Sequence, residues 1–291
     1  MKKVALLIVI FTFFLFSFQE DKPAYKIFDS EGKEVGYNSM LEKIKEADIV
    51  FFGELHNNAI AHWMQYELTA DLFKAKGEKL VLGAEMFEAD NQLMIDEYLK
   101  SIISEEKFED EAKLWPNYQT DYKPLLNFAK ENKLPFIATN IPRRYAAVVY
   151  KEGFEGLEKL SDEAKKFIAP LPFEYDENLN CYKSMLEMGG MKKGMGAGNN
   201  NLPKAQAAKD ATMAYFTLKN WEKGKTFLHF NGSYHSDNHE SIVWYLKKKN
   251  KDLKIVTITT ITQKDLTTMD ESAKGTADFI LVVPETMTNT Y

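Results

Sequence analysis

Acidic and imidazole side chains come directly after short apolar runs at several points in this chain. Two carboxylates and two histidines gathered at one place can bind a divalent metal ion, or can act as acid and base in catalysis. The candidate residues are Glu54 and His56 after the run 48–52, Glu85 after 80–84, Asn140 and Arg143 after 136–139, and His235 after 227–230.

The runs that precede these residues are short, apolar and rich in β-branched or aromatic side chains, which predicts buried strands. Helical patterns lie between them, and strands that alternate with helices form a mostly parallel central sheet with helices on both faces. Ligands bind such a sheet outside the carboxyl ends of its strands. We therefore expect the six side chains to line one polar site, although each could instead only cap the helix that follows it.

The spacing of these residues does not select one chemistry. The sequence contains no His-Glu-x-x-His, no Cys-x-x-Cys and no phosphate-binding glycine loop. Ser233 follows Gly232, but no glycine stands two residues after it, so the nucleophile elbow Gly-x-Ser-x-Gly is absent. A metal site and an acid–base site therefore both stay open for Glu54, His56, Glu85 and His235.

Asn140 and Arg143 are suited to hold an anionic group. Pro142 is predicted to open a helix, and the first turn of a helix has backbone N–H groups that are free to bind anions. Arg144 could take this role instead, since adjacent residues on a helix point about 100° apart. A third interpretation is that Arg143 forms an ion pair with one of the two glutamates of the cluster. Another histidine, His229, lies within an apolar run and is predicted to be a hydrogen-bonded core residue.

Length and composition are those of a globular protein with one large α/β domain or two smaller ones. The chain has 291 residues, of which 45% are hydrophobic and 27% charged, which is ordinary globular usage. Its formal net charge of −6 argues against a broad basic face for nucleic acid, so we expect no nucleic-acid partner.

Residues 1–19 are predicted to be a secretory signal peptide. Lys2 and Lys3 precede an apolar run from Val4 to Phe18, which is shorter than the roughly 20 residues of a membrane span. The expected location is therefore periplasmic or otherwise exported, and membrane association is expected only if this segment stays uncleaved. Cys181 is the sole cysteine, so the chain has neither a lipobox nor an internal disulfide.

The remaining residues, 20–291, are predicted to form a single α/β domain with a small N-terminal hairpin that turns at Gly32. An irregular helical insert is expected around residues 161–210. Four methionines in it, at positions 185, 188, 191 and 195, are spaced three or four apart. They could form an apolar stripe on a helix, a soft lid over an apolar ligand, or axial ligands to a metal or haem.

Several short motifs, in this order along the chain, resemble the ChaN family of iron-regulated haem-binding proteins, within the Tiki/TraB/erythromycin-esterase-like superfamily. The resemblance covers roughly residues 40 to 283. The motifs are Gly53-Glu-x-His56, Leu82-Gly-Ala-Glu-Met-Phe87 with Gln92, Trp115 with Tyr118 and Tyr122, Asn140-Ile-Pro-Arg-Arg-Tyr145, Ala205-Gln206 with Asp210-Ala-Thr-Met-Ala214, and Gly232-x-x-His235.

The resemblance implies an α/β fold and a cell-envelope role in haem and iron uptake. It also implies a homodimer around stacked haems, with a tyrosine on the iron. Tyr175 or Tyr182 of the insert is the tyrosine expected in that role, and the alternative for both is a place in the core. Arg143, Lys192 or Lys193 would neutralise the propionates. The missing lipobox departs from the lipoproteins of the family, so lipid anchoring is not expected.

Relatives in the wider superfamily imply an alternative, a hydrolase acting on peptides or esters. In that case Glu54 or Glu85 would activate water, His235 or His56 would move protons or bind a divalent metal, and Arg143 would hold an oxyanion.

Overall fold

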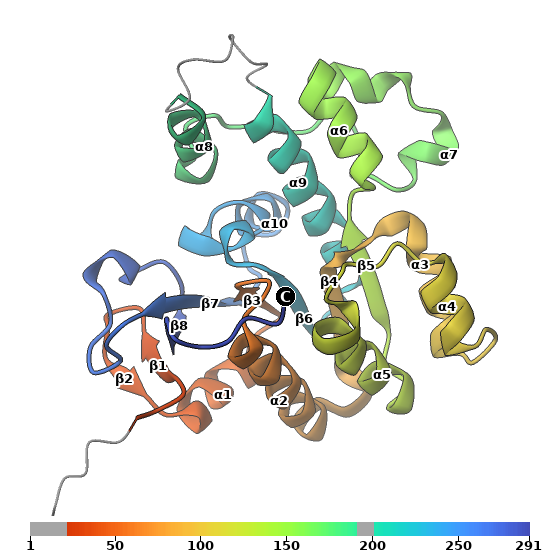
Figure 1. Cartoon of the computed structure of the whole chain (residues 1–291). Helices are drawn as coiled ribbons and strands as arrows, with labels where there is room; N and C mark the ends of the chain where they lie inside the picture. The colour runs from red at the N-terminus through yellow and green to blue at the C-terminus, as the bar shows by residue number, and fades with distance from the viewer. Residues whose placement is uncertain (1–21, 191–200) are drawn as a thin grey trace, which may run out of the picture.

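An eight-stranded sheet with helices on both faces forms the body of the protein (Figure 1). The computed structural model describes residues 22–190 and 201–291, and of residues 187–190 only the backbone. The predicted signal peptide, Met191, Met195 and the two lysines at 192 and 193 lie outside the described residues. No helix in the described part is long and apolar enough to cross a bilayer.

The strand order is β2-β1-β8-β7-β3-β6-β4-β5. All neighbours from β8 to β5 are parallel, whereas β1 pairs antiparallel with β8 and β2. The predicted fold class and the N-terminal hairpin are therefore confirmed. The strands are β1 (Lys26–Asp29), β2 (Glu34–Val35), β3 (Ile49–Glu54), β4 (Leu80–Glu88), β5 (Phe136–Asn140), β6 (Thr226–Gly232), β7 (Ile255–Gln263) and β8 (Phe279–Pro284).

Helices connect the strands as the helical patterns predict. They are α1 (Tyr37–Lys45), α2 (Ala59–Lys76), α3 (Gln92–Leu99), α4 (Glu105–Glu111), α5 (Lys123–Glu131), α6 (Arg143–Glu152), α7 (Asp162–Lys165), α8 (Asn180–Gly190), α9 (Leu202–Asn220) and α10 (Ile242–Lys249). The pattern over 104–117 predicts a surface helix, but α4 ends at Glu111, and Ala112 after it already has an extended backbone. The pattern over 236–249 predicts a further helix, but α10 begins only at Ile242, after two 3₁₀ turns.

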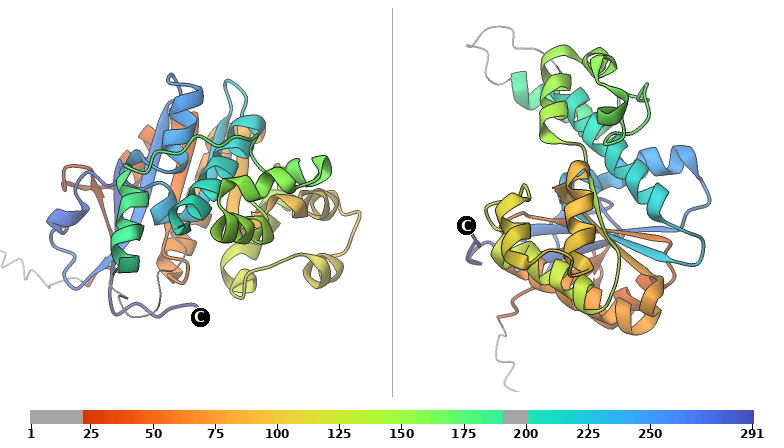
Figure 2. Two further views of the ribbon diagram at one scale, coloured as in Figure 1. Left: turned by 90° about the horizontal axis from the view of Figure 1, so that it is seen from above. Right: turned by 90° about the vertical axis from the view of Figure 1, so that its right-hand side faces the viewer.

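The two faces of the sheet are covered by different helices (Figure 2). Alternate residues of β3 point to opposite faces, as the pleat requires. Val50 and Phe52 pack in one core with α1, α2 and α5, whereas Ile49 and Phe51 pack in another with α9 and α10.

Helices α6 to α9 form an upper lobe that stands above the sheet (Figures 1 and 2). The lobe has its own small core, in which Ala146 and Val149 of α6 meet Ala205 and Ala208 of α9. The carboxyl-terminal half of α9 packs on the sheet instead, through Met213 and neighbouring residues. Helix α9 therefore joins the lobe to the sheet, although its first residues fall in the predicted irregular insert.

Candidate functional site

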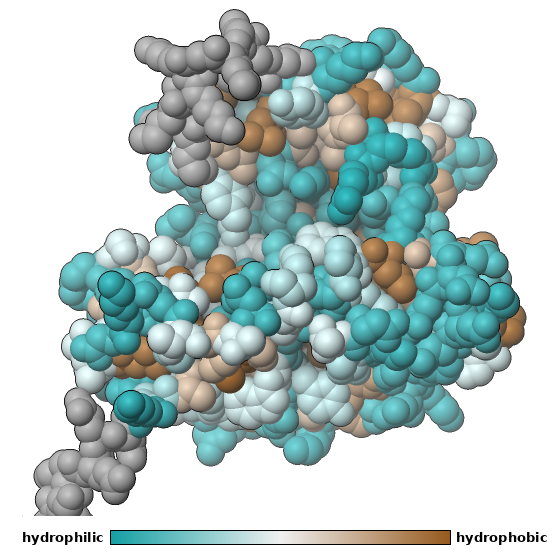
Figure 3. All heavy atoms as spheres, in the orientation of Figure 1, coloured by the Kyte–Doolittle hydropathy of each residue, from teal (hydrophilic) through white to brown (hydrophobic). Residues whose placement is uncertain are grey.

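A cavity of about 1220 Å³ lies between the upper lobe and the carboxyl ends of the strands. Figure 3 shows that the molecular surface is hollowed between these two parts. Six predicted residues line this cavity together, namely Glu54, His56, Glu85, Asn140, Arg143 and His235. The sheet positions them because β3, β6, β4 and β5 are neighbours in it and all run in one direction.

Two helix faces of the lobe form the other wall of the cavity. The lining residues recur at helical spacing on each helix. They are Arg143, Ala146, Ala147 and Tyr150 on α6, and Leu202, Ala205, Gln206 and Lys209 on α9. The small alanines in both rows leave space between these helices and the strand ends, and the longer residues provide polar and aromatic groups.

Glu54, the last residue of β3, orients His56. The Glu54 carboxylate is almost fully buried and accepts hydrogen bonds from the Tyr122 hydroxyl (2.7 Å), the Gln65 amide (2.5 Å) and His56 Nδ1 (2.9 Å). Because the carboxylate cannot donate, Nδ1 carries the proton of the neutral imidazole and Nε2 keeps its lone pair. Trp115 packs edge-on against the same ring at 4.9 Å between centroids.

The backbone of the loop that follows β3 is also held by hydrogen bonds. The Asn117 amide donates to the carbonyl of His56 (2.8 Å) and to Asp121 (2.6 Å). His62 on α2 also contacts the His56 carbonyl, through Nε2 at 3.1 Å. A histidine held at its own side chain and at its backbone has little freedom to turn, so its Nε2 is presented to the cavity in one orientation.

Glu85 and His235 form a second array that extends into α9. Glu85 accepts a hydrogen bond from the Gly232 N–H at 2.9 Å, and its other oxygen lies 3.2 Å from His235 Nε2. His235 Nδ1 donates to Asp210 at 2.5 Å, and the Tyr182 hydroxyl donates to the second oxygen of Asp210 at 2.7 Å. A carboxylate at each ring nitrogen requires both nitrogens to donate, so His235 is an imidazolium.

The charges of this array shift the pKa values of its members. Burial disfavours the charged form of His235, but the carboxylates of Glu85 and Asp210 outweigh it and raise its pKa to about 10. Burial likewise opposes the charged form of Glu85, yet the neighbouring imidazolium holds its pKa well below the ordinary range. For His56, burial is again outweighed, here by the hydrogen bond to Glu54 and the charge of Glu85, so its pKa is raised.

His56, which Glu54 orients, and Glu85, which binds His235, both lie next to Gly232. A Cβ added to this glycine would lie 2.8 Å from His56 Nε2 and 3.6 Å from a Glu85 oxygen. Contacts shorter than 3 Å are not tolerated, so only glycine leaves room for the imidazole at this point.

A bulge in β4 places Glu85 at the cavity. Ala84 pairs with Ala138 of β5, but the next pair joins Glu88 to Asn140, so β4 has four residues where β5 has two. Such a bulge bends the strand and redirects its side chains. The sequence pattern did not reveal it, because a bulge keeps the apolar composition of the strand.

Two polar residues of β6 and its turn have structural roles. His229 is fully buried and bonds to Thr139 (2.8 Å) and Asn231 (3.0 Å), which confirms the predicted core histidine. Burial lowers its pKa to about 4, so the ring is neutral near pH 7. Ser233 donates to the backbone carbonyl of Glu54 at 3.2 Å, in agreement with the absence of a nucleophile elbow.

Arg143 is exposed and forms no ion pair with the residues described, so the pairing with Glu54 or Glu85 is wrong. Its neighbour Arg144 is the one that is paired, at 2.5 Å from Asp90. Lys209 on α9 is likewise without an ion pair among the described side chains. The Asn140 amide is 8% exposed, and its oxygen is buried with no hydrogen-bond partner in the described chain. These groups give the cavity two available cations and an unused amide.

The expected metal cluster does not take a metal-binding form. Among the described residues, no group of three or more His, Cys, Asp or Glu side chains is arranged to hold a metal ion. Glu54 and Glu85 direct their oxygens to hydrogen-bond donors instead, as given above. A metal role for Glu54, His56, Glu85 and His235 stays a prediction without support from the geometry.

The two tyrosines expected to ligate haem iron do not line the cavity. Tyr182 is fully buried and bonded to Asp210, and Tyr175 is half-buried against Phe154 and the Tyr182 ring. Burial raises the pKa of both phenols. The tyrosines that line the cavity are Tyr150, Tyr234 and Tyr291. Tyr150 could have been found from the sequence, since it lies two helical turns after Arg143 and so on the same face.

Comparison with known proteins relates the chain to one family. Residues 40–246 match the family described as haem-binding uptake, Tiki superfamily, ChaN. ChaN of Campylobacter jejuni, whose structure is described as showing cofacial haem binding, has a TM-score of 0.67 at 16% identity, covering 89% of this chain and 96% of that one. A protein from Bacillus cereus gives 0.52 at 12% identity, with coverage of 90% and 95%. At these identities the likeness shows the fold alone.

A curated relative, the chloroplastic protein RETICULATA-RELATED 5 of Arabidopsis thaliana, is 27% identical over 135 residues. That alignment covers 44% of this chain, and the chain spans only 18% of the length of that relative.

Proposed function

The chain belongs to the ChaN family of haem-binding uptake proteins, and we propose that it binds haem as cargo in the large cavity between its lobe and its sheet. The observation that carries the proposal is the cavity itself. Its volume of about 1220 Å³ exceeds the ~300–1,000 Å³ usual for small-molecule sites, so it can accept a large flat ligand.

The lining residues fit a porphyrin. Haem needs apolar walls, a ligand for the iron and cations for two propionates. Ala146, Ala147, Ala205 and Ile261 supply apolar wall, and Arg143 and Lys209 supply positive charge that no carboxylate of the described chain neutralises. The amide of Asn140 adds an unused hydrogen-bonding group beside Arg143.

Tyr150 is the tyrosine best placed to ligate iron. It is 49% exposed and projects from the same face of α6 as Arg143, so a haem held by that arginine would lie against it. Tyr234 also lines the cavity, and its hydroxyl contacts the backbone carbonyl of Cys181 and the hydroxyl of Ser184. Tyr291 stands at the rim and is 62% exposed.

A haemin titration tests the proposal. Wild-type protein should give a saturable shift of the Soret band, and Tyr150→Phe should change the position of that band and weaken binding. Tyr66→Phe is the matched control, because Tyr66 is a half-exposed tyrosine on α2 that packs on Phe128, away from the cavity. No saturable shift for the wild type would refute haem binding. An unchanged spectrum in Tyr150→Phe would refute the ligand while leaving the cargo in place.

We propose further that two chains cover the haem together. Three large side chains at the cavity, Tyr150, Leu202 and Tyr291, are 46% to 62% exposed, and a second copy or a ligand would bury them. Light scattering should show a monomer without haemin and a dimer with it. A haem-loaded monomer would contradict the dimer.

Export through residues 1–19 is the accompanying proposal for location, supported by the basic and then apolar pattern of that segment. The intact mass of protein recovered from the cell envelope should lack the signal segment. Recovery of the full-length chain from the cytoplasm would contradict it.

A hydrolase is the second candidate function, favoured by the geometry of His56. Glu54 fixes Nδ1, which leaves Nε2 facing the cavity as a base, and the Glu85–His235 array adds a buried charge pair nearby. A panel of esters and peptides tests this function, with elemental analysis for bound metal. Turnover by wild type that is no higher than that of His56→Ala and Glu85→Ala would exclude it.

A further inference from the structure

A second, smaller pocket lies on the far side of α9 from the large cavity. Its volume is about 330 Å³, at the lower end of the range of small-molecule sites. Its walls are the segment 169–174, the last turns of α9 and the last turns of α10. Helices α9 and α10 each precede a parallel strand, so their carboxyl ends lie at the amino edge of the sheet, opposite the edge that bears the large cavity.

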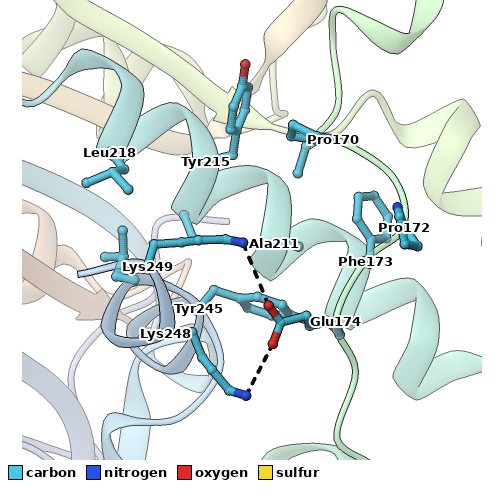
Figure 4. A pocket seen from close by; sticks show the side chains of 13 residues that line it. Pro170, Pro172, Phe173, Glu174, Ala211, Tyr215, Leu218, Tyr245, Lys248 and Lys249 are labelled. Atoms are coloured by element: carbon cyan, nitrogen blue, oxygen red, sulfur yellow. Dashed lines mark hydrogen bonds and ion pairs between the residues drawn. The ribbon is translucent and has the colours of Figure 1, made fainter. Parts of the chain in front are cut away.

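The interior of this pocket is apolar. Figure 4 shows Pro170 and Phe173 from the segment facing Tyr215 and Leu218 of α9, with the ring of Tyr245 from α10 beside them. The Tyr245 hydroxyl is already used, since it donates to the carbonyl of Glu174 at 2.7 Å. The wall therefore offers hydrocarbon and ring surface to an occupant.

The rim of the pocket already holds one carboxylate between two ammonium groups. Lys248 Nζ lies 3.2 Å from one oxygen of Glu174, and Lys249 Nζ lies 3.7 Å from the other (Figure 4). The lysines hold the pKa of Glu174 below its ordinary range, Lys248 having the larger effect. All three side chains are half or more exposed, so this contact is weak and can be exchanged.

We propose that this pocket binds a compact apolar molecule that carries a single carboxylate, such as a short fatty acid. The hydrocarbon part enters between Phe173, Tyr215 and Leu218, and the carboxylate takes the place of Glu174 at the two lysines. The charges at the rim favour an anion, because two lysines face one glutamate there. A neutral or cationic ligand would leave the extra positive charge uncompensated.

Calorimetric titration with octanoate, octanol and octyltrimethylammonium tests the charge requirement. Octanoate should bind with the highest affinity and the cation with the lowest. Glu174→Gln removes the competing carboxylate and should tighten octanoate binding by about two- to fivefold, as expected for exposed ion pairs. Lys248→Gln together with Lys249→Gln should weaken octanoate by a similar factor and leave octanol unchanged. Equal binding of octanoate and octanol would overturn the proposal.

Two further measurements locate the site. Leu218→Trp fills the pocket and should abolish octanoate binding, while the thermal transition shows that the protein remains folded. Saturation with haemin should leave the octanoate affinity unchanged, because the large cavity lies at the opposite edge of the sheet. Binding that survives Leu218→Trp, or that haemin displaces, would overturn a separate site. This test stands whether or not haem binds, since octanoate is titrated first without haemin.

Discussion

Asp210 of α9 and His235 of the turn after β6 lie 2.5 Å apart, from carboxylate Oδ1 to imidazole Nδ1. This contact links the helix that carries the upper lobe to the strand ends that form the floor of the cavity. Through Tyr182 it also reaches α8, since the phenol donates to the same carboxylate. A buried ion pair therefore adds to the apolar packing of α9 in holding the lobe over the site.

Removing one partner of that pair should destabilise the protein strongly. Asp210→Ala leaves the His235 imidazolium with Glu85 alone and empties a buried position, so we expect a loss of about 3–5 kcal/mol in the free energy of unfolding. Urea denaturation measures this loss. Asp252→Ala, at an exposed turn, is the control and should change stability by about 0.5 kcal/mol or less. A loss below about 1 kcal/mol in Asp210→Ala would show that the pair contributes little.

The raised pKa of His235 predicts how stability depends on pH. Its pKa rises from 6.5 to about 10 on folding, so the stabilisation is fully present below pH 6.5 and is lost as the pH rises toward 10. The free energy of unfolding should therefore decline over this alkaline window in the wild type. In His235→Gln the decline should be shallower, as denaturation at a series of pH values would show. Parallel curves for the two proteins would contradict the assignment.

Gly232→Ala should displace His56. The added methyl group would stand 2.8 Å from Nε2, so the ring must turn away from the cavity and lose its alignment with Glu54. We expect a loss of stability of about 1–3 kcal/mol from overpacking, together with weaker haemin binding. Gly36→Ala is the matched control, because a Cβ there meets nothing within 4 Å. Haemin affinity equal to that of wild type in Gly232→Ala would separate His56 from the haem site.

Two adjacent arginines provide an internal test of the propionate contact. Arg143 lines the large cavity without an ion pair among the described residues, whereas Arg144 is bound to Asp90. Arg143→Gln should therefore weaken haemin binding by about five- to tenfold, corresponding to roughly 1 kcal/mol. Arg144→Gln should leave it unchanged. Haem dimethyl ester, which lacks the carboxylates, should bind both variants equally. Equal loss of haemin affinity in the two variants would argue against a specific contact.

The order of apolar runs and helical patterns was enough to predict the parallel sheet, since burial on both faces demands continuous apolar strands. It was also enough to predict that Glu54, His56, Glu85 and His235 would lie at one edge of that sheet, because parallel strands end on the same side. Helical periodicity also predicts which face of its helix Tyr150 and Lys209 each occupy. That these two faces line the cavity follows only from the tertiary structure, in which α6 and α9 face the strand ends.

Tertiary structure alone decided which partner each polar group takes. Asp210 and His235 are 25 residues apart, and Glu85 and Gly232 are 147 apart, so local patterns carry no information about these contacts. It also decided that, within residues 22–190 and 201–291, Arg144 and not Arg143 is the paired arginine, since Asp90 approaches only one of the two helix positions. The spacing of residues within a helix or strand determines the face on which a side chain lies. The charged groups and the free space around that side chain depend on distant segments that only folding brings close.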